Sequence, residues 1–277
     1  MDKAMNGVSK KYILSTGNVL NVADLRKKAG QKPAEELFDA LEVTIRDSEK
    51  VVLDDGTTEI RLKNNDLHTK MKELTRDEIK IGAKVFLNDF SKENLRVAID
   101  SALRILDITG FNSLVLAYHP KTNLTNGDAS VHEPEIKEGV IHWGDDSGKC
   151  FKDLKELWTV LEEYVDEQKI CLLGVSDINC ETLKELFESA KHPPQITQIN
   201  LSACCVVPPD LKNFCNEKEI QLLTHSDPQE IIKKENLAGL NLGDLTPTCT
   251  LRYQVHIKCR GVLQAKGFIV TTATDDH

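Results

Sequence analysis

The chain has 277 residues, with 44 acidic and 35 basic side chains and a formal net charge of −9. This length is usual for one α/β barrel, and no low-complexity run or linker divides residues 1–277, so we expect a single domain. The acidic balance argues against broad binding of nucleic acid or anionic membranes, which favours a basic face. The apolar runs near Leu114 and Cys171 are far shorter than a membrane-spanning helix, and no signal peptide is evident. We therefore expect a cytoplasmic protein.

The eight cysteines lie at positions 150, 171, 180, 204, 205, 215, 249 and 259, and none forms a C-x-x-C pair. A zinc site or a thioredoxin-type redox site thus has no support, and we expect no metal and no cofactor. In a cytosolic chain the default expectation is reduced thiols, most of them buried as small hydrophobic residues.

The first third of the chain has an irregular pattern. Residues 12–21 predict a short strand that a Gly-Asn pair interrupts, and a helix follows at 33–47 with apolar residues at four-residue spacing. Residues 48–76 are polar, with two candidate strands at 51–53 and 59–62. This part predicts an irregular start to the fold.

From residue 84 onwards, apolar strands alternate with amphipathic helices. The predicted strands span 84–87, 114–118, 170–175, 196–201 and 220–224. The predicted helices span 92–106, 151–166, 177–190 (with Ser176-Asp177 at its N-cap), 209–218 and 227–234. Alternation over short connections predicts right-handed βαβ units and a parallel sheet, which favours a (β/α)8-type TIM barrel. Residues 121–150 interrupt it as a polar surface loop, and 251–257 with 262–270 predict a C-terminal hairpin.

Three segments in the same order resemble strands of the aldo-keto reductases. They are LDITGFNSLVLAYHP at 106–120, KICLLGVS at 169–176 and QITQINL at 195–201. The resemblance covers roughly residues 86–228 and implies an aldo-keto reductase-like barrel.

That resemblance also implies a catalytic tetrad, of which this sequence matches only the histidine, at His119. The family uses a tyrosine as general acid, tuned by a lysine and an aspartate. No tyrosine lies between Tyr12 and Tyr118, and Lys92 is out of register with the expected lysine. The late cofactor-phosphate signature is also unmatched. The resemblance therefore implies the barrel without the reductase site.

A second resemblance covers almost the whole chain. The segments STGNVLN at 15–21, NLSACCVVPPDL at 200–211, IQLLTHSDP at 220–228 and LRY at 251–253 are similar to the modifier subunits of glutamate–cysteine ligase. This resemblance implies a non-catalytic partner that forms a heterodimer with the ligase's catalytic subunit in glutathione synthesis, improves glutamate use and relaxes feedback inhibition by glutathione. The 121–150 insertion and the 271–277 tail match this family poorly.

Two features are candidates for interaction or redox chemistry. Cys204 and Cys205 follow a predicted barrel strand, where loops carry function, so one of them could form a disulfide with the partner or sense oxidation. The alternative is two ordinary thiols. His119 could bind a carbonyl or carboxylate at the barrel mouth or serve as a packing residue, and His225 has the same two interpretations.

Two other surfaces and functions stay open. Lys258, Arg260 and Lys266 form a basic patch that could dock an acidic surface, or simply a solvated hairpin. An oxidoreductase with a degenerate site and a barrel that senses a metabolite remain alternatives to the regulatory subunit.

Overall fold

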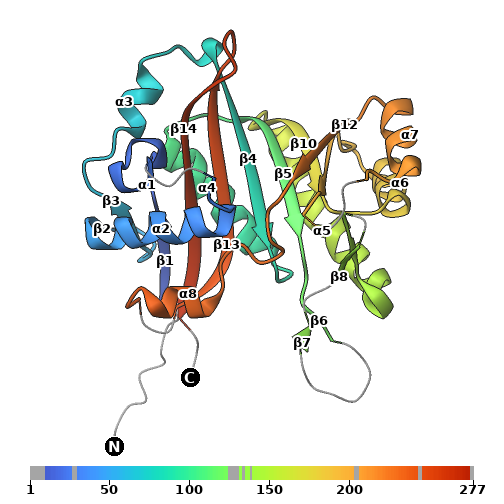
Figure 1. The fold of residues 1–277 in the computed structure, drawn as a ribbon, viewed down its shortest axis with the longest axis horizontal. Coiled ribbons are helices and arrows are strands. Elements are labelled where there is room, and N and C mark those ends of the chain that lie inside the picture. The colour runs from blue at the N-terminus through green and yellow to red at the C-terminus, as the bar shows by residue number, and fades with distance from the viewer. Residues whose placement is uncertain are drawn as a thin grey trace, which may run out of the picture.

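The computed structural model describes residues 10–26, 30–123, 131–132, 135–137, 139–202, 206–242 and 245–274. Within them a ten-stranded sheet has the strand order β12-β11-β10-β5-β4-β13-β14-β1-β3-β2 (Figure 1). The sheet includes strands from both ends of the described chain, because β1 (Lys11–Ser15) pairs antiparallel with β14 (Val262–Thr274).

One half of this sheet is parallel. Its strands are β4 (Ile79–Leu87), β5 (Phe111–Tyr118), β10 (Ile170–Ser176), β11 (Ile196–Asn200) and β12 (Gln221–His225). The connections contain α4 (Lys92–Leu106), α5 (Ser147–Asp166), α6 (Cys180–Ser189) and α7 (Pro209–Glu217). These elements confirm the predicted α/β class with parallel βα units, which suits strands that are apolar on both faces.

The other half is formed by the C-terminal hairpin and the N-terminal strands. β13 (Leu245–Ile257) runs antiparallel to both β4 and β14, and this confirms the predicted hairpin. β3 (Thr58–Leu62) is parallel to β1, and β2 (Ser48–Val52) is antiparallel to β3. After β12 the chain thus adds a long hairpin rather than another parallel βα unit, so β12 and β2 are the edge strands of the order given above.

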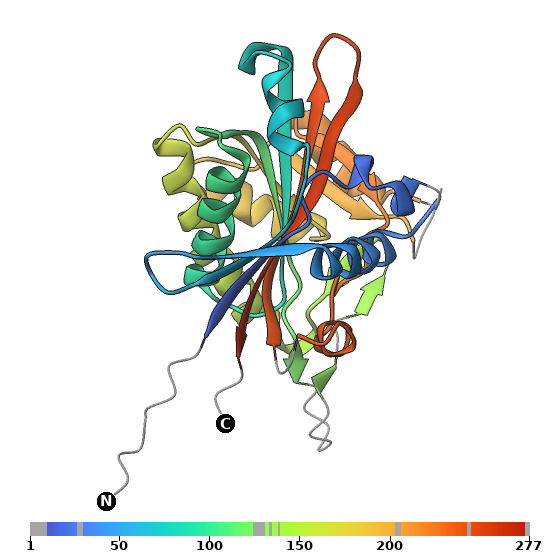
Figure 2. The same cartoon turned by 90° about the vertical axis from the view of Figure 1, so that its left-hand side faces the viewer.

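Helices cover the sheet on both sides. In Figure 2, α4 and α2 (Pro33–Arg46) lie on opposite sides of the strands. One apolar core packs α4, α5, α6 and α7 against the parallel strands, with Trp158 and Phe111 among its largest buried side chains. A second core packs α2 and α8 (Lys234–Gly239) against β1 and β14. The remaining helical segments are α1 (Ala23–Arg26), α3 (Leu67–Lys72), η1 (Val19–Asn21), η2 (Arg76–Glu78) and η3 (Gly144–Asp146).

The structure corrects three local predictions. The 121–150 stretch is more than a surface loop: its described residues form β6 (Thr122–Asn123), β7 (Val131–His132), β8 (Glu135–Lys137) and β9 (Val140–His142), and α5 starts at Ser147. Ile141 and Trp143 are buried, so these apolar side chains pack part of the segment into the core despite its polar composition. The helix predicted at 227–234 begins only at Lys234. The N-cap of α6 is Asn179, whose side chain accepts from the Thr182 N–H, and not Ser176-Asp177.

Candidate functional site

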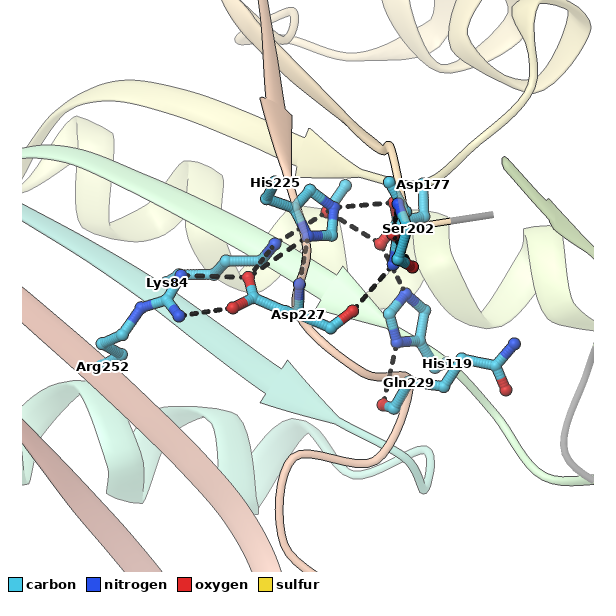
Figure 3. Close-up of polar contacts among 10 residues, drawn as sticks. Lys84, His119, Asp177, Ser202, His225, Asp227, Gln229 and Arg252 are labelled. Carbon is cyan, nitrogen blue, oxygen red and sulfur yellow. Dashed lines mark hydrogen bonds and ion pairs between the residues drawn. The ribbon is translucent and has the colours of Figure 1, made fainter. Parts of the chain in front are cut away.

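A cluster of charged side chains lies where the parallel strands end. We call it the buried charge network; its members come from β4, β10, β12, β13 and the segments after β5, β10 and β12 (Figure 3). They are Lys84, His119, Ser176, Asp177, His225, Asp227 and Arg252. The side chains at 84, 119, 176, 177 and 227 belong to residues that are at most 4% exposed. Ligand sites of parallel α/β folds lie at this end of the strands, so the network is the candidate functional site.

Asp227 is one centre of the network. Its carboxylate accepts a hydrogen bond from Lys84 Nζ at 2.9 Å and two from the Arg252 guanidinium at 2.5 and 3.0 Å. The His225 ring lies 3.3 Å away through Nδ1. Two cations therefore neutralise one carboxylate that is shielded from water, the arrangement in which charge-assisted hydrogen bonds are strongest.

Asp177 is the other centre. It accepts from His119 Nε2 at 3.0 Å, from His225 Nε2 at 2.8 Å and from Ser176 Oγ at 2.9 Å. Lys84 Nζ donates to the same Ser176 hydroxyl at 3.0 Å, which links the two centres. His119 Nδ1 faces the carbonyl oxygen of Gln229 at 3.0 Å, so both ring nitrogens of His119 face oxygen acceptors.

The network shifts the titration of its members. Burial alone would raise the pKa of Asp177, but hydrogen bonds from His119 and His225 outweigh it and hold the pKa below its ordinary value. Asp227 behaves alike: burial opposes ionisation, yet the bond from His225 and the charges of Lys84 and Arg252 lower its pKa. Both carboxylates are therefore ionised at neutral pH.

The basic members respond in opposite directions. Burial lowers the pKa of Lys84, against the opposing attraction of Asp227 and Asp177. Burial also disfavours the charged form of His225, but its bonds to Asp177 and Asp227 prevail and raise its pKa. The two carboxylates thus determine which basic groups stay protonated inside the sheet.

Local backbone geometry turns Asp177 into the network. The residue follows β10 and has a φ of 65°, a left-handed backbone conformation that is uncommon for residues other than glycine. Its side chain is fully buried. Such strain persists only where surrounding contacts hold it, and here the bonds from both histidines and Ser176 do so.

The predicted site residues have different outcomes. His119 lies inside the network, as does His225. Cys204 and Cys205 lie outside the described residues. Lys258 and Arg260 are exposed at the hairpin end, but Lys266 is half-buried and ion-pairs with Glu36, so it does not extend the basic patch.

Sequence reasoning missed most of the network. Lys84 was assigned only to an apolar strand, and Ser176-Asp177 only to a helix cap. Arg252 was assigned only to the hairpin. A lysine within an otherwise apolar strand is a usable signal, since a buried lysine requires a partner. Nothing local identifies Asp227, 143 residues away, as that partner.

Three tyrosines are buried, and their environments do not favour proton donation. Burial raises the pKa values of Tyr118, Tyr164 and Tyr253. Tyr253 donates to the Gly17 carbonyl at 2.7 Å, and Tyr164 donates to Asp100 at 2.8 Å. None of these three hydroxyls is held in the acidified state that a general-acid tyrosine needs.

Comparison with known proteins assigns the fold to a family. Residues 63–228 match the family model described as "Aldo/keto reductase family". The chain is 31% identical to the glutamate–cysteine ligase regulatory subunit of Mus musculus over 93% of this chain and 90% of that protein. The chain is also 31% identical to the glutamate–cysteine ligase regulatory subunit of Homo sapiens, over 97% of this chain and 94% of that protein. The chain belongs to the glutamate–cysteine ligase regulatory subunits, within the aldo/keto reductase family.

The likeness to reductases of this family is shorter. The chain is 27% identical to NADPH-dependent codeinone reductase 1-2 of Papaver somniferum, over 55% of this chain and 43% of that enzyme. In this chain Asp177 is fully buried, and its oxygens accept hydrogen bonds from two histidines and a serine.

No helix in the described part of the chain is long and apolar enough to cross a membrane. The described residues also contain no group of three or more His, Cys, Asp or Glu side chains arranged to hold a metal ion.

Proposed function

We propose that this chain is a non-catalytic regulatory subunit. It binds the catalytic subunit of glutamate–cysteine ligase in the cytoplasm as a heterodimer, improves that enzyme's use of glutamate and relaxes its feedback inhibition by glutathione. The observation that carries the proposal is the 31% identity to curated regulatory subunits over 93–97% of the chain. We take the whole chain to act as one domain, which the continuous sheet from β1 to β14 supports.

The site supports a non-catalytic role. Within the buried charge network, the cationic side chains pair with Asp177 and Asp227. These two carboxylates stay ionised and are buried away from solvent. Tyr118, Tyr164 and Tyr253 are held with raised pKa values, the opposite of what a proton-donating tyrosine requires. In this proposal the network acts as a polar core that keeps the strand ends in place.

A regulatory subunit lowers the glutamate KM only if it prefers the conformation of the catalytic subunit that binds glutamate better. A few-fold change in KM needs about 1 kcal/mol of that preference. The test is the glutamate KM of the cognate catalytic subunit with and without this chain, under reducing conditions. A lower KM together with a complex on gel filtration supports the proposal. An unchanged KM with no complex refutes it.

The alternative is an oxidoreductase with a degenerate site, which the 55% coverage by codeinone reductase favours. Titration of the chain with NADPH, followed by its fluorescence, separates the two functions. Saturable binding together with turnover of a carbonyl substrate would establish the reductase.

Cys204 and Cys205 remain the candidates for a disulfide with the partner or for oxidation sensing. The variant Cys204→Ser/Cys205→Ser tests this role in the complex. If the variant forms the complex as the wild type does, and if its complex responds to oxidant in the same way, the two thiols have no such role. Cys259→Ser is the control, since Cys259 is an exposed cysteine in the turn between β13 and β14.

A further inference from the structure

An open groove of about 440 Å³ lies on one face of the parallel strands. Side chains from β4, β5, β10, β11, β12 and β13 line it. We call this feature the strand groove.

The strand groove is basic on an acidic chain. Its basic lining residues are Lys80, Lys84, Arg252 and His256, and none of the described residues lining it is Asp or Glu. The chain as a whole has a formal charge of −9. Lys84 and Arg252 are committed to Asp227, whereas Lys80 is exposed and pairs with no carboxylate among the described residues. Lys80 therefore offers an uncompensated positive charge to an incoming acidic group.

Apolar side chains accompany this charge. Leu172 is 38% exposed and Leu223 is 36% exposed, and both line the groove. Unpaired amides of Gln221 and Gln254 lie along the same lining in the described structure. A surface with exposed leucines, amides and cations suits a polypeptide with alternating apolar and acidic side chains.

The groove ends at an open sheet edge. β12 pairs with β11 on one side and is the last strand of the order. The Gln221 N–H bonds to the Gln195 carbonyl, so residues 221, 223 and 225 direct their backbone groups toward β11. Because these directions alternate along a strand, Leu222 and Thr224 direct theirs toward the free edge. An exposed edge of this kind can take an added strand.

We propose that an extended, acidic segment of the partner adds as a strand along β12 and places its side chains in the strand groove. This inference rests on the proposed function, because the partner is the ligase's catalytic subunit. Backbone pairing to Leu222 and Thr224 supplies affinity that is independent of sequence. Lys80 and the exposed leucines select acidic and apolar side chains on the added strand.

The test compares groove variants with variants on the opposite edge strand. Lys80→Glu/His256→Glu reverses the charge of the groove, and Leu223→Asp introduces an acid at its apolar wall. Lys50→Glu and Val52→Asp on β2 are the matched controls, since Lys50 is exposed and Val52 is 70% exposed. The dissociation constant of the cognate catalytic subunit is measured at low and high salt, alongside the glutamate KM at saturating chain.

Both groove variants should weaken binding about tenfold or more, and both controls about twofold or less. The charge-reversed variant should also show a weaker salt dependence than the wild type. Hydrogen exchange at the Leu222 and Thr224 amides should slow in the wild-type complex. At saturation the groove variants should still lower the glutamate KM.

Each other outcome is decisive. Groove variants that bind as tightly as the wild type, with unprotected β12 amides, refute the groove while the regulatory function stands. Equal weakening by groove and control variants points to general surface electrostatics and also refutes it. A wild-type chain that neither binds the catalytic subunit nor changes its KM overturns the proposed function and this inference together.

Discussion

Replacing Asp227 by Asn tests whether the buried charge network holds the strand ends together. The substitution keeps the shape of the side chain but removes a negative charge that is 2% exposed. Lys84 would then keep its hydrogen bond to Ser176 Oγ at 3.0 Å, and the Arg252 guanidinium would lose its bidentate carboxylate. Removing one partner of a buried pair costs about 3–5 kcal/mol, because the other charge stays buried without compensation.

A surface carboxylate provides the control for that magnitude. Asp166 pairs with Lys191 at 2.7 Å, but its side chain is 45% exposed. Water screens an exposed pair, so Asp166→Asn should cost much less stability than Asp227→Asn. Urea unfolding followed by circular dichroism measures both variants against the wild type. If Asp227→Asn costs no more than Asp166→Asn, the network is not the structural element that we infer.

The double variant Lys84→Met/Asp227→Asn separates loss of charge from loss of packing. Removing the lysine also removes the uncompensated cation, so the double variant should lose less stability than the sum of the two single variants. Strict additivity would show that Lys84 and Asp227 do not interact in the folded protein.

Two further predictions follow from the pKa shifts and from close packing. The raised pKa of His225 contributes stability that is complete below its unfolded value of about 6.5 and is lost as pH rises through the folded value. The stability advantage of the wild type over His225→Asn should therefore shrink as the pH rises above about 6.5, and a constant or growing difference in urea melts would contradict the raised pKa. Gly267→Ala would place a Cβ 2.1 Å from the Gly17 carbonyl oxygen and should cost roughly 1–3 kcal/mol by calorimetry. Gly148→Ala, with open space in α5, should be neutral or stabilise by up to about 1 kcal/mol, and equal effects of the two would refute the packing argument.

The sequence alone determined most of the local structure. Four-residue apolar spacing predicted α4 and α2 nearly to their ends, and buried apolar runs identified β5, β10 and β11. The alternation of these elements predicted parallel βα units, and the patterns at 251–257 and 262–270 predicted the final hairpin. These features depend on neighbours a few residues apart, whose spacing a sequence records directly.

Tertiary structure alone decided the site and the groove. Lys84 meets Asp227 across 143 residues, and Asp177, whose backbone is left-handed after β10, accepts hydrogen bonds from both histidines. The opening beside β12 depends on β13 pairing antiparallel with β4, a register that no local pattern encodes. Pairing between strands that are distant in the sequence determines which polar side chains lie together in the interior. Because burying an unpaired charge costs free energy, these side chains must then pair with one another.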